Sequence, residues 1–176
     1  DSTRLNAEGA APLKSAVGEI LSVGDRGQLT GIVAKLHTTV ANPFFGVGVQ
    51  ADLMNSDINA LYISQSGLTM GNRDYYLDPE NEHIRKGYKE YLGRIFRFAG
   101  IPEADVEKAV AGVMNVETKL AEKSWSNVEL RNIPAQYNPT AKADFEKTYD
   151  AVDWEAYYKA MGIGDLETDH GPRRRR

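Results

Sequence analysis

Three histidines, His37, His83 and His170, are the side chains best suited to holding a catalytic metal ion. A helical zinc-peptidase site needs two imidazoles four residues apart on one face, with a glutamate after the first histidine as the base. The positions four residues after these histidines hold Ala, Gly and Arg, and none of the three is followed by Glu. We therefore predict that this chain contributes no metal ligand and no catalytic residue.

Other catalytic patterns are also missing. The acidic pairs Glu80/Glu82 and Glu103/Asp105 fall in the first turns of predicted helices, where carboxylates stabilise the helix dipole. There is no Gly-x-Ser-x-Gly sequence, no glycine-rich phosphate loop and no cysteine, which excludes thiolate catalysis and disulfides. We interpret His37 as a structural residue, because it lies near a predicted helix end, where a cation is favourable.

The segment Arg73-Asp74-Tyr75-Tyr76 concentrates polar and aromatic groups in a predicted loop. An arginine can bind a carboxylate through two parallel hydrogen bonds, so one interpretation is contact with a peptide. The other is structural: we expect Arg73 to be held by Asp74 or another acid, and Tyr75 or Tyr76 to be buried. Both interpretations remain open from the sequence.

Composition is that of a folded globular protein. The chain has 176 residues, 41% hydrophobic and 26% charged, which is enough for a packed core. Without Arg173–Arg176, the 21 basic residues fall to 17 against 25 acidic ones, a net charge of −8. Such an acidic body disfavours a nucleic-acid partner. No apolar run approaches the ~20 residues of a membrane span.

Hydrophobic periodicity predicts a mainly α fold with one β-hairpin. Apolar residues at helical spacing indicate amphipathic helices, and Phe45, Val47, Val49 and Ala51 alternate with other residues as in a strand. The two helices joined by three residues around Gly100 are expected to be antiparallel neighbours. The helices are predicted over residues 9–23, 25–39, 78–100, 102–123, from about 140, and 153–161, with the hairpin over 44–65.

Several finer expectations follow from the same patterns. The glycines at 46 and 48 suggest that other atoms approach the strand backbone closely. Trp125 and Trp154 are expected to be packing residues, and Tyr149 to point inward. The segments 67–78 and 127–138 are predicted to be irregular.

Several short motifs follow one another in a fixed order along the chain. They are Asn42–Val49, Asp52, Asn55-Ser56, Gln65, Gly67-Leu68, Arg73–Tyr76, Arg131, Pro134, Tyr137-Asn138, Thr140 and Val152–Trp154. This series is similar to the non-catalytic half of neprilysin-type zinc metallopeptidases, the group of neprilysin, endothelin-converting enzyme and bacterial oligopeptidase O. One departure is Met70-Gly71, where the family has Leu-Pro.

The resemblance implies a larger, two-lobed helical peptidase. It implies that residues 1–165 are part of the N-terminal helical region, and that the zinc ion of the full-length parent lies elsewhere, with no cofactor in this chain. This region would shape the substrate cavity of a metalloendopeptidase that acts on small peptides, with the catalytic remainder as its partner. The parent would be secreted, periplasmic or cell-surface.

The C-terminal residues 166–176 are interpreted as a disordered or artificially added tail, although their arginine run could also contact phosphates. The absence of cysteine favours a bacterial source. The alternative to a peptidase fragment is a stand-alone helical binding module without enzymatic activity.

Overall fold

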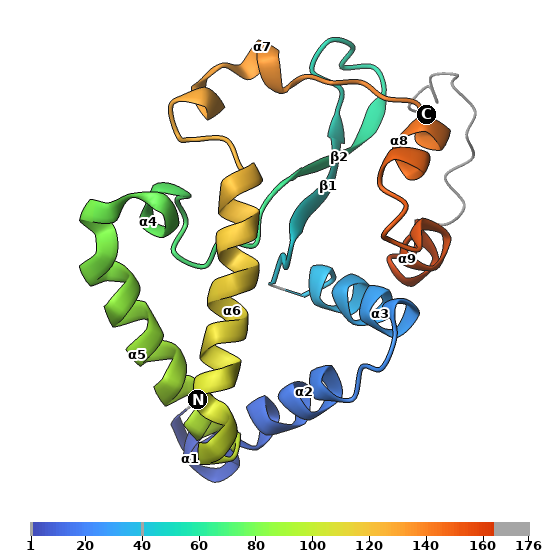
Figure 1. Ribbon diagram of the computed structural model, residues 1–176. Helices are drawn as coiled ribbons and strands as arrows, with labels where there is room; N and C mark the ends of the chain where they lie inside the picture. The colour runs from blue at the N-terminus through green and yellow to red at the C-terminus, as the bar shows by residue number, and fades with distance from the viewer. Residues whose placement is uncertain (1, 40, 164–176) are drawn as a thin grey trace. The chain divides into compact units, whose positions relative to one another are not determined.

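The computed structural model describes residues 2–39 and 41–163 (Figure 1). The predicted fold class, helical with one hairpin, is confirmed within those ranges; the expected tail at 166–176 lies outside them. The elements are α1 Ser2–Glu8, α2 Ala11–Leu21, α3 Arg26–His37, β1 Phe45–Ala51, β2 Asn59–Gln65, α4 Asp74–Leu77, the 3-10 turn η1 Pro79–Asn81, α5 Glu82–Ala99, α6 Glu103–Lys123, the 3-10 turn η2 Glu129–Arg131, α7 Ile133–Gln136, α8 Lys142–Thr148 and α9 Trp154–Ala160.

The chain forms two compact units, and each is built from two separate stretches of sequence. The first unit comprises Asp1–Val23 and Leu68–Ser126, and the second comprises Gly24–Gly67 and Asn127–Arg176. Among the described residues, no helix combines the length and apolar character needed to cross a membrane.

The first unit is centred on α5 and α6, which pack as the predicted antiparallel neighbours. Gly100 ends α5 in the left-handed conformation at φ 89°, which a glycine adopts without steric cost. The short helix α4 packs against both long helices. The buried cluster of this unit consists of Tyr76, Tyr88, Leu92, Met114 and Ala121.

Aspartate side chains cap two of the helical segments. The Asp25 carboxylate accepts a hydrogen bond from the Gln28 amide at the start of α3, at 2.8 Å. The Asp78 carboxylate accepts from the Glu80 amide at 2.9 Å, although the turn it caps is the 3-10 turn η1 rather than α5 itself. The local sequence therefore places both helix starts to within a few residues.

Three predicted apolar faces are less buried than expected. Ile20 and Leu21 on α2 are 43% and 67% exposed, and no α2 residue is buried. Tyr91 on α5 and Tyr149 after α8 are about half exposed, so the inward orientation predicted for Tyr149 is wrong. Helical spacing places these side chains on an apolar stripe, but only a neighbouring element can bury them, and the described residues do not supply enough cover.

The second unit packs the hairpin and α9 around α3. β1 and β2 pair antiparallel with Val47 opposite Ile63. Val33, Ala34, Trp154, Tyr157 and Tyr158 are its buried core. The packing role predicted for Trp154 is confirmed, since it is 6% exposed. Packed against this core are the half-buried Phe45, Val47, Leu61, Ile63 and Phe145.

Trp125 is less buried than Trp154, and only one of the two strand glycines is closely approached by other atoms. Trp125 is 38% exposed, so it is a weaker packing residue than Trp154. A side chain at Gly46 would meet the Ser64 hydroxyl at 2.8 Å, which confirms a close approach there. Gly48 faces open space, so the same expectation is wrong at that position.

Candidate functional site

The segment singled out in the sequence, Arg73 to Tyr76, lies in the first unit and is more ordered than a loop. The prediction of an irregular segment is wrong in part, because Asp74–Leu77 forms α4. The Arg73 guanidinium Nη1 donates to the carbonyl of Ser124, the C-cap of α6, at 2.8 Å. Asp74 is an ion-pair partner at the longer distance of 3.9 Å. The negative end of the α6 dipole therefore holds this cation more closely than the carboxylate does.

Tyr76 connects that segment to a buried carboxylate that the sequence analysis missed. Glu117 is 8% exposed on α6, and its Oε2 accepts from the Tyr76 hydroxyl at 2.6 Å. Its Oε1 accepts from the Thr69 hydroxyl at 2.6 Å and from the Tyr88 hydroxyl at 3.2 Å. We call Thr69, Tyr76, Tyr88 and Glu117 the Glu117 cluster. Its function in this arrangement is to tie the segment before α4 to both long helices.

Three hydroxyls donate hydrogen bonds to the two oxygens of the Glu117 carboxylate. Burial raises the pKa of Tyr76, with the bond to Glu117 as a further cause. Burial likewise raises the pKa of Tyr88 to about 12. Both phenols therefore keep their protons near neutral pH. A glutamate within the apolar stripe of a predicted helix, three residues before Leu120, was the available sequence signal.

Replacing Arg73 with alanine is expected to destabilise the fold by about 1–3 kcal/mol, the range for a hydrogen bond to a charged group. The change removes the bond to the Ser124 carbonyl at the end of α6. Thermal unfolding followed by circular dichroism measures the effect. The matched control is Arg94→Ala, at an exposed position on α5, which should stay within about 0.5 kcal/mol of the unmodified chain. Equal melting of both variants would show that Arg73 has no structural role.

Arg85 cannot serve as that control. Helical spacing places it on the outer face of α5, but its Nη1 donates to the Tyr75 carbonyl at 3.0 Å and to the Asp78 carbonyl at 2.6 Å. Arg85 is therefore not a free outer-face residue, because it holds carbonyl groups of the chain before α5. Arg73 and Arg85 therefore both hold carbonyl groups around α4.

His37 lies in the second unit, where its surroundings favour a neutral ring and not the positive charge expected from the sequence. Its Nε2 lies 3.2 Å from the Pro43 carbonyl, which can only accept, so Nε2 carries the proton. Nδ1 then accepts from the Tyr157 hydroxyl at 2.6 Å. Burial lowers the pKa of His37, against the raising effect of backbone hydrogen bonds. The proximity to a helix end is thus outweighed by desolvation, and the neutral ring fits the site.

Acidification should therefore weaken the second unit through His37. The folded-state pKa of His37 lies below the usual histidine value of about 6.5, so the unfolded chain takes up a proton more readily. Stability from this residue is present above pH 6.5 and falls as the pH drops below it. Urea unfolding at pH 7.5 and 5.5 should show a smaller pH-dependent loss for His37→Gln than for the unmodified chain. His83→Gln, at an exposed position, should keep the full loss.

The histidines that the structure describes lie apart from one another and have structural surroundings. His83 is exposed, with Nδ1 at 3.2 Å from the Glu80 carbonyl, and His170 lies outside the described residues. In the part of the chain that the structure describes, no three His, Cys, Asp or Glu side chains are grouped so that they could hold a metal ion.

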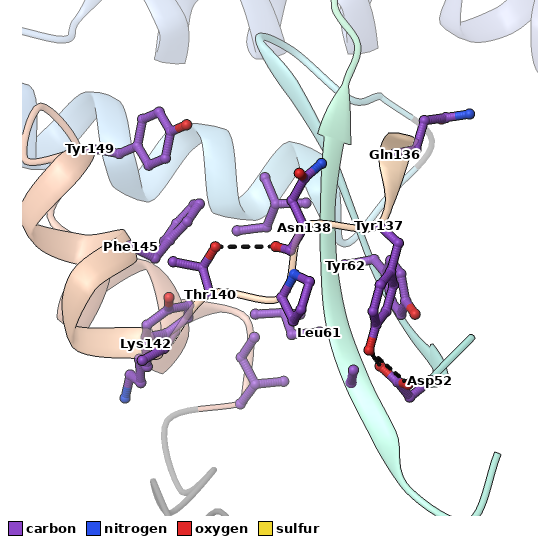
Figure 2. A pocket seen from close by; sticks show the side chains of 16 residues that line it. Asp52, Leu61, Tyr62, Gln136, Tyr137, Asn138, Thr140, Lys142, Phe145 and Tyr149 are labelled. Carbon is purple, nitrogen blue, oxygen red and sulfur yellow. Dashed lines mark hydrogen bonds between the residues drawn. The ribbon is translucent and has the colours of Figure 1, made fainter. Parts of the chain in front are cut away.

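A pocket of about 850 Å³ lies in the second unit beside β2 (Figure 2). Residues 60–63 of β2 form one wall of the pocket. Residues 136–142, from the end of α7 to the start of α8, form another part of its lining. The Asp52 carboxylate accepts from the Tyr137 hydroxyl at 3.1 Å and from the amides of Met54 and Asn55, each at 2.9 Å. These bonds fix the hairpin turn to the segment that follows α7.

The other end of the pocket is aromatic. Phe145, Tyr149 and Tyr158 line this end, and Lys142 lies at its margin. Figure 2 shows Phe145, Tyr149 and Lys142. The Lys142 ammonium is 4.9 Å from the centre of the Tyr158 ring and 3.8 Å from the Glu146 carboxylate. The arrangement can accept an apolar or aromatic group with an anion beside it. Sequence reasoning assigned no role to this pocket.

Comparison with known proteins supports the family resemblance. Residues 1–171 match the model described as Peptidase family M13. Endothelin-converting enzyme 1 of Rattus norvegicus is 30% identical over 122 residues, which make up 68% of this chain and 16% of that protein. Neprilysin-3 of Drosophila melanogaster is 29% identical over 119 residues, 66% of this chain and 15% of that protein.

Solved structures extend the similarity to the whole fold. Zinc metalloprotease Zmp1 of Mycobacterium tuberculosis, solved by cryo-electron microscopy in its open state, superposes with a TM-score of 0.85 at 25% identity, covering 92% of this chain and 25% of that chain. PepO from Lactobacillus rhamnosis shares the fold, with a TM-score of 0.72 at 19% identity over 93% of this chain. The chain spans about a sixth of the length of its curated relatives. The motif series, the family model and the superposition agree, and the chain belongs to peptidase family M13.

Proposed function

We propose that this chain is the N-terminal, non-catalytic part of a zinc metalloendopeptidase that acts on small peptides. Its role is to shape the substrate cavity, while the zinc site lies in the catalytic remainder, its partner. Two observations together carry the proposal. The chain shares its fold with the zinc metalloprotease Zmp1 over 92% of its length. Its described residues nevertheless contain no group of side chains that could hold a metal ion. The parent is proposed to be secreted, periplasmic or on the cell surface.

Apolar side chains on the first unit support a large partner. Ile20 and Leu21 on α2, Tyr91 and Phe98 on α5, and Val116 on α6 are all at least 42% exposed. Large exposed apolar groups that gather in patches commonly mark surfaces covered by another protein part. Relatives about four times longer than this chain, such as Zmp1, contain enough additional polypeptide to provide that cover.

The chain alone is expected to bind no stoichiometric zinc and to cleave no peptide, because its histidines lack ligand spacing. Zinc is measured by mass spectrometry on untagged protein after dialysis with the metal. Cleavage is measured on a fluorogenic peptide, with Zmp1 as the positive control. One equivalent of retained zinc, or peptide turnover that a chelator abolishes, would contradict the proposal.

The binding-module alternative has a separate test. The coding sequence after the codon for residue 165 either continues into a segment with His-Glu-x-x-His or stops. Continuation into that segment supports the peptidase part. A stop codon there favours a stand-alone helical binding module and overturns the proposed role in a substrate cavity.

A further inference from the structure

The outer edge of β2 presents unpaired backbone groups. The Asp52 amide donates to the Ile58 carbonyl at 2.9 Å, which makes these two residues a hydrogen-bonded pair. Such pairs alternate along an antiparallel ladder, so Leu61 and Ile63 direct their N–H and C=O groups away from β1. Among residues 2–39 and 41–163, none forms a hydrogen bond with these groups. Two donors and two acceptors are therefore available along this edge.

The sequence of β2 does nothing to protect that edge. Natural proteins commonly blunt exposed edges with charged residues, proline or bulges. β2 reads Asn-Ala-Leu-Tyr-Ile-Ser-Gln, without a charge or a proline, and its pairing with β1 is regular over seven residues. Leu61 and Ile63 are two positions apart, so their outward groups repeat every ~6.6–6.8 Å, the repeat of an extended peptide.

The pocket lies along this edge and has room for side chains. Leu61 and Ile63 both belong to its wall, and its volume of about 850 Å³ falls within the usual ~300–1,000 Å³ of ligand pockets. The aromatic end, formed by Phe145, Tyr149 and Tyr158, suits an apolar or aromatic side chain.

The charged residues of the pocket lining favour a peptide that carries a carboxylate. Asp52 and Lys142 are the two charged residues of the pocket lining. The Asp52 carboxylate is already satisfied by Tyr137 and the turn amides. Lys142 contacts the Tyr158 ring at 4.9 Å and the Glu146 carboxylate at 3.8 Å, the latter beyond good hydrogen-bond distance. The charge left for a ligand is therefore positive, and it complements a carboxylate.

We propose that the outer edge of β2 binds an extended, acidic peptide as a third strand. The peptide backbone bonds to Leu61 and Ile63, an apolar or aromatic side chain enters the aromatic end of the pocket, and a carboxylate pairs with Lys142. β-strand addition of this kind derives affinity from the main chain and selectivity from the side-chain pockets. The choice of a peptide from solution as the occupant rests on the proposed function.

The test uses N-methylated peptides, which change the ligand and leave the protein intact. The probe is the acetylated pentapeptide Thr-Val-Phe-Val-Glu with a free C-terminus, titrated into the 15N-labelled 176-residue chain and followed by NMR. One analogue carries N-methyl groups on its even residues and the other on its odd residues. Because only alternate amides of an added strand face β2, we expect the two analogues to differ at least tenfold in Kd. The Leu61 and Ile63 amide signals should shift on binding of the parent peptide.

Variants of the protein test whether the charge of Lys142 contributes to peptide binding. Lys142→Gln should weaken binding about three- to tenfold, whereas Lys147→Gln, at an exposed position on the same helix, should not change it. No binding at millimolar peptide, equal affinities of the two analogues, or shifts confined to residues outside the pocket would each overturn the proposal. So would a dimer in which the Leu61 and Ile63 amides are already protected from exchange, since a second copy would then occupy the edge.

Failure here is distinguishable from failure of the proposed function. The zinc, cleavage and coding-sequence tests do not involve β2. A chain that binds no zinc and continues into a zinc-binding segment, yet ignores the pentapeptide, would refute only the peptide site.

Discussion

Replacing Glu117 with alanine is expected to lower the free energy of unfolding by about 3–4 kcal/mol, because it leaves buried hydroxyls without an acceptor and opens a cavity. Thr69, Tyr76 and Tyr88 all lose their shared partner. Buried donors without acceptors are among the few causes of losses this large. Urea unfolding at pH 7.5, monitored by circular dichroism, measures the change in the midpoint and the slope.

Glu122→Ala is the matched control, since this residue lies on the same helix and is exposed. It should change stability by less than about 0.5 kcal/mol. Adding Tyr76→Phe to each background tests the coupling directly. The phenylalanine should cost about 1–2 kcal/mol in the unmodified chain and clearly less beside Glu117→Ala, because the bond is already gone. Additive losses would show that Glu117 and Tyr76 do not act together.

Replacing Trp154 with alanine should cost about 3–5 kcal/mol, the usual loss for a large aromatic residue removed from a core. Trp154 is 6% exposed, and its indole Nε1 donates to the Tyr149 carbonyl at 2.8 Å. Its ring lies 4.9 Å from that of Phe145 and 5.6 Å from that of Tyr157, measured between centroids. The variant therefore loses packing in the core of the second unit and one of the bonds that fix the end of α8.

Trp125→Ala separates that packing effect from the general loss of a tryptophan. Trp125 is 38% exposed, so its replacement should cost less than half as much. Hydrogen exchange measured by NMR adds spatial resolution. In Trp154→Ala the amides of β1, β2 and α3 should exchange faster, whereas those of α5 and α6 should change less. Similar stability of the two variants would contradict the proposed core of the second unit.

Local signals in the sequence predict most of the helices. The helix starts near Asp25 and Asp78 and the helix end at Gly100 are recovered, because a cap or a left-handed turn depends on a few neighbouring residues. The hairpin is also recovered, since alternation along Phe45–Ala51 is a local pattern. α4 is missed, because four residues have little helical preference by themselves and Tyr76 is held by Glu117, 41 residues away.

The candidate sites depend on contacts that no local pattern contains. Asp52 and Tyr137 are 85 residues apart, and their bond forms one end of the β2 pocket. His37 and Tyr157 are 120 residues apart, and that contact decides which imidazole nitrogen carries the proton. Arg73 was recognised as a notable residue, but its partner, a helix-end carbonyl at Ser124, has no side-chain signature in the sequence.

The interleaving of the two units has a consequence for synthesis on the ribosome. The first unit is complete once Ser126 has emerged, but the hairpin, finished at Gln65, lacks the α9 part of its core until Trp154 and the rest of α9 are made. At ~5–20 residues per second, the nascent hairpin waits for roughly 5–19 s. Its uncharged strand edges can pair with other chains during that interval. A chaperone that shields extended apolar segments should therefore raise the yield of this protein more than that of a helical protein of equal length.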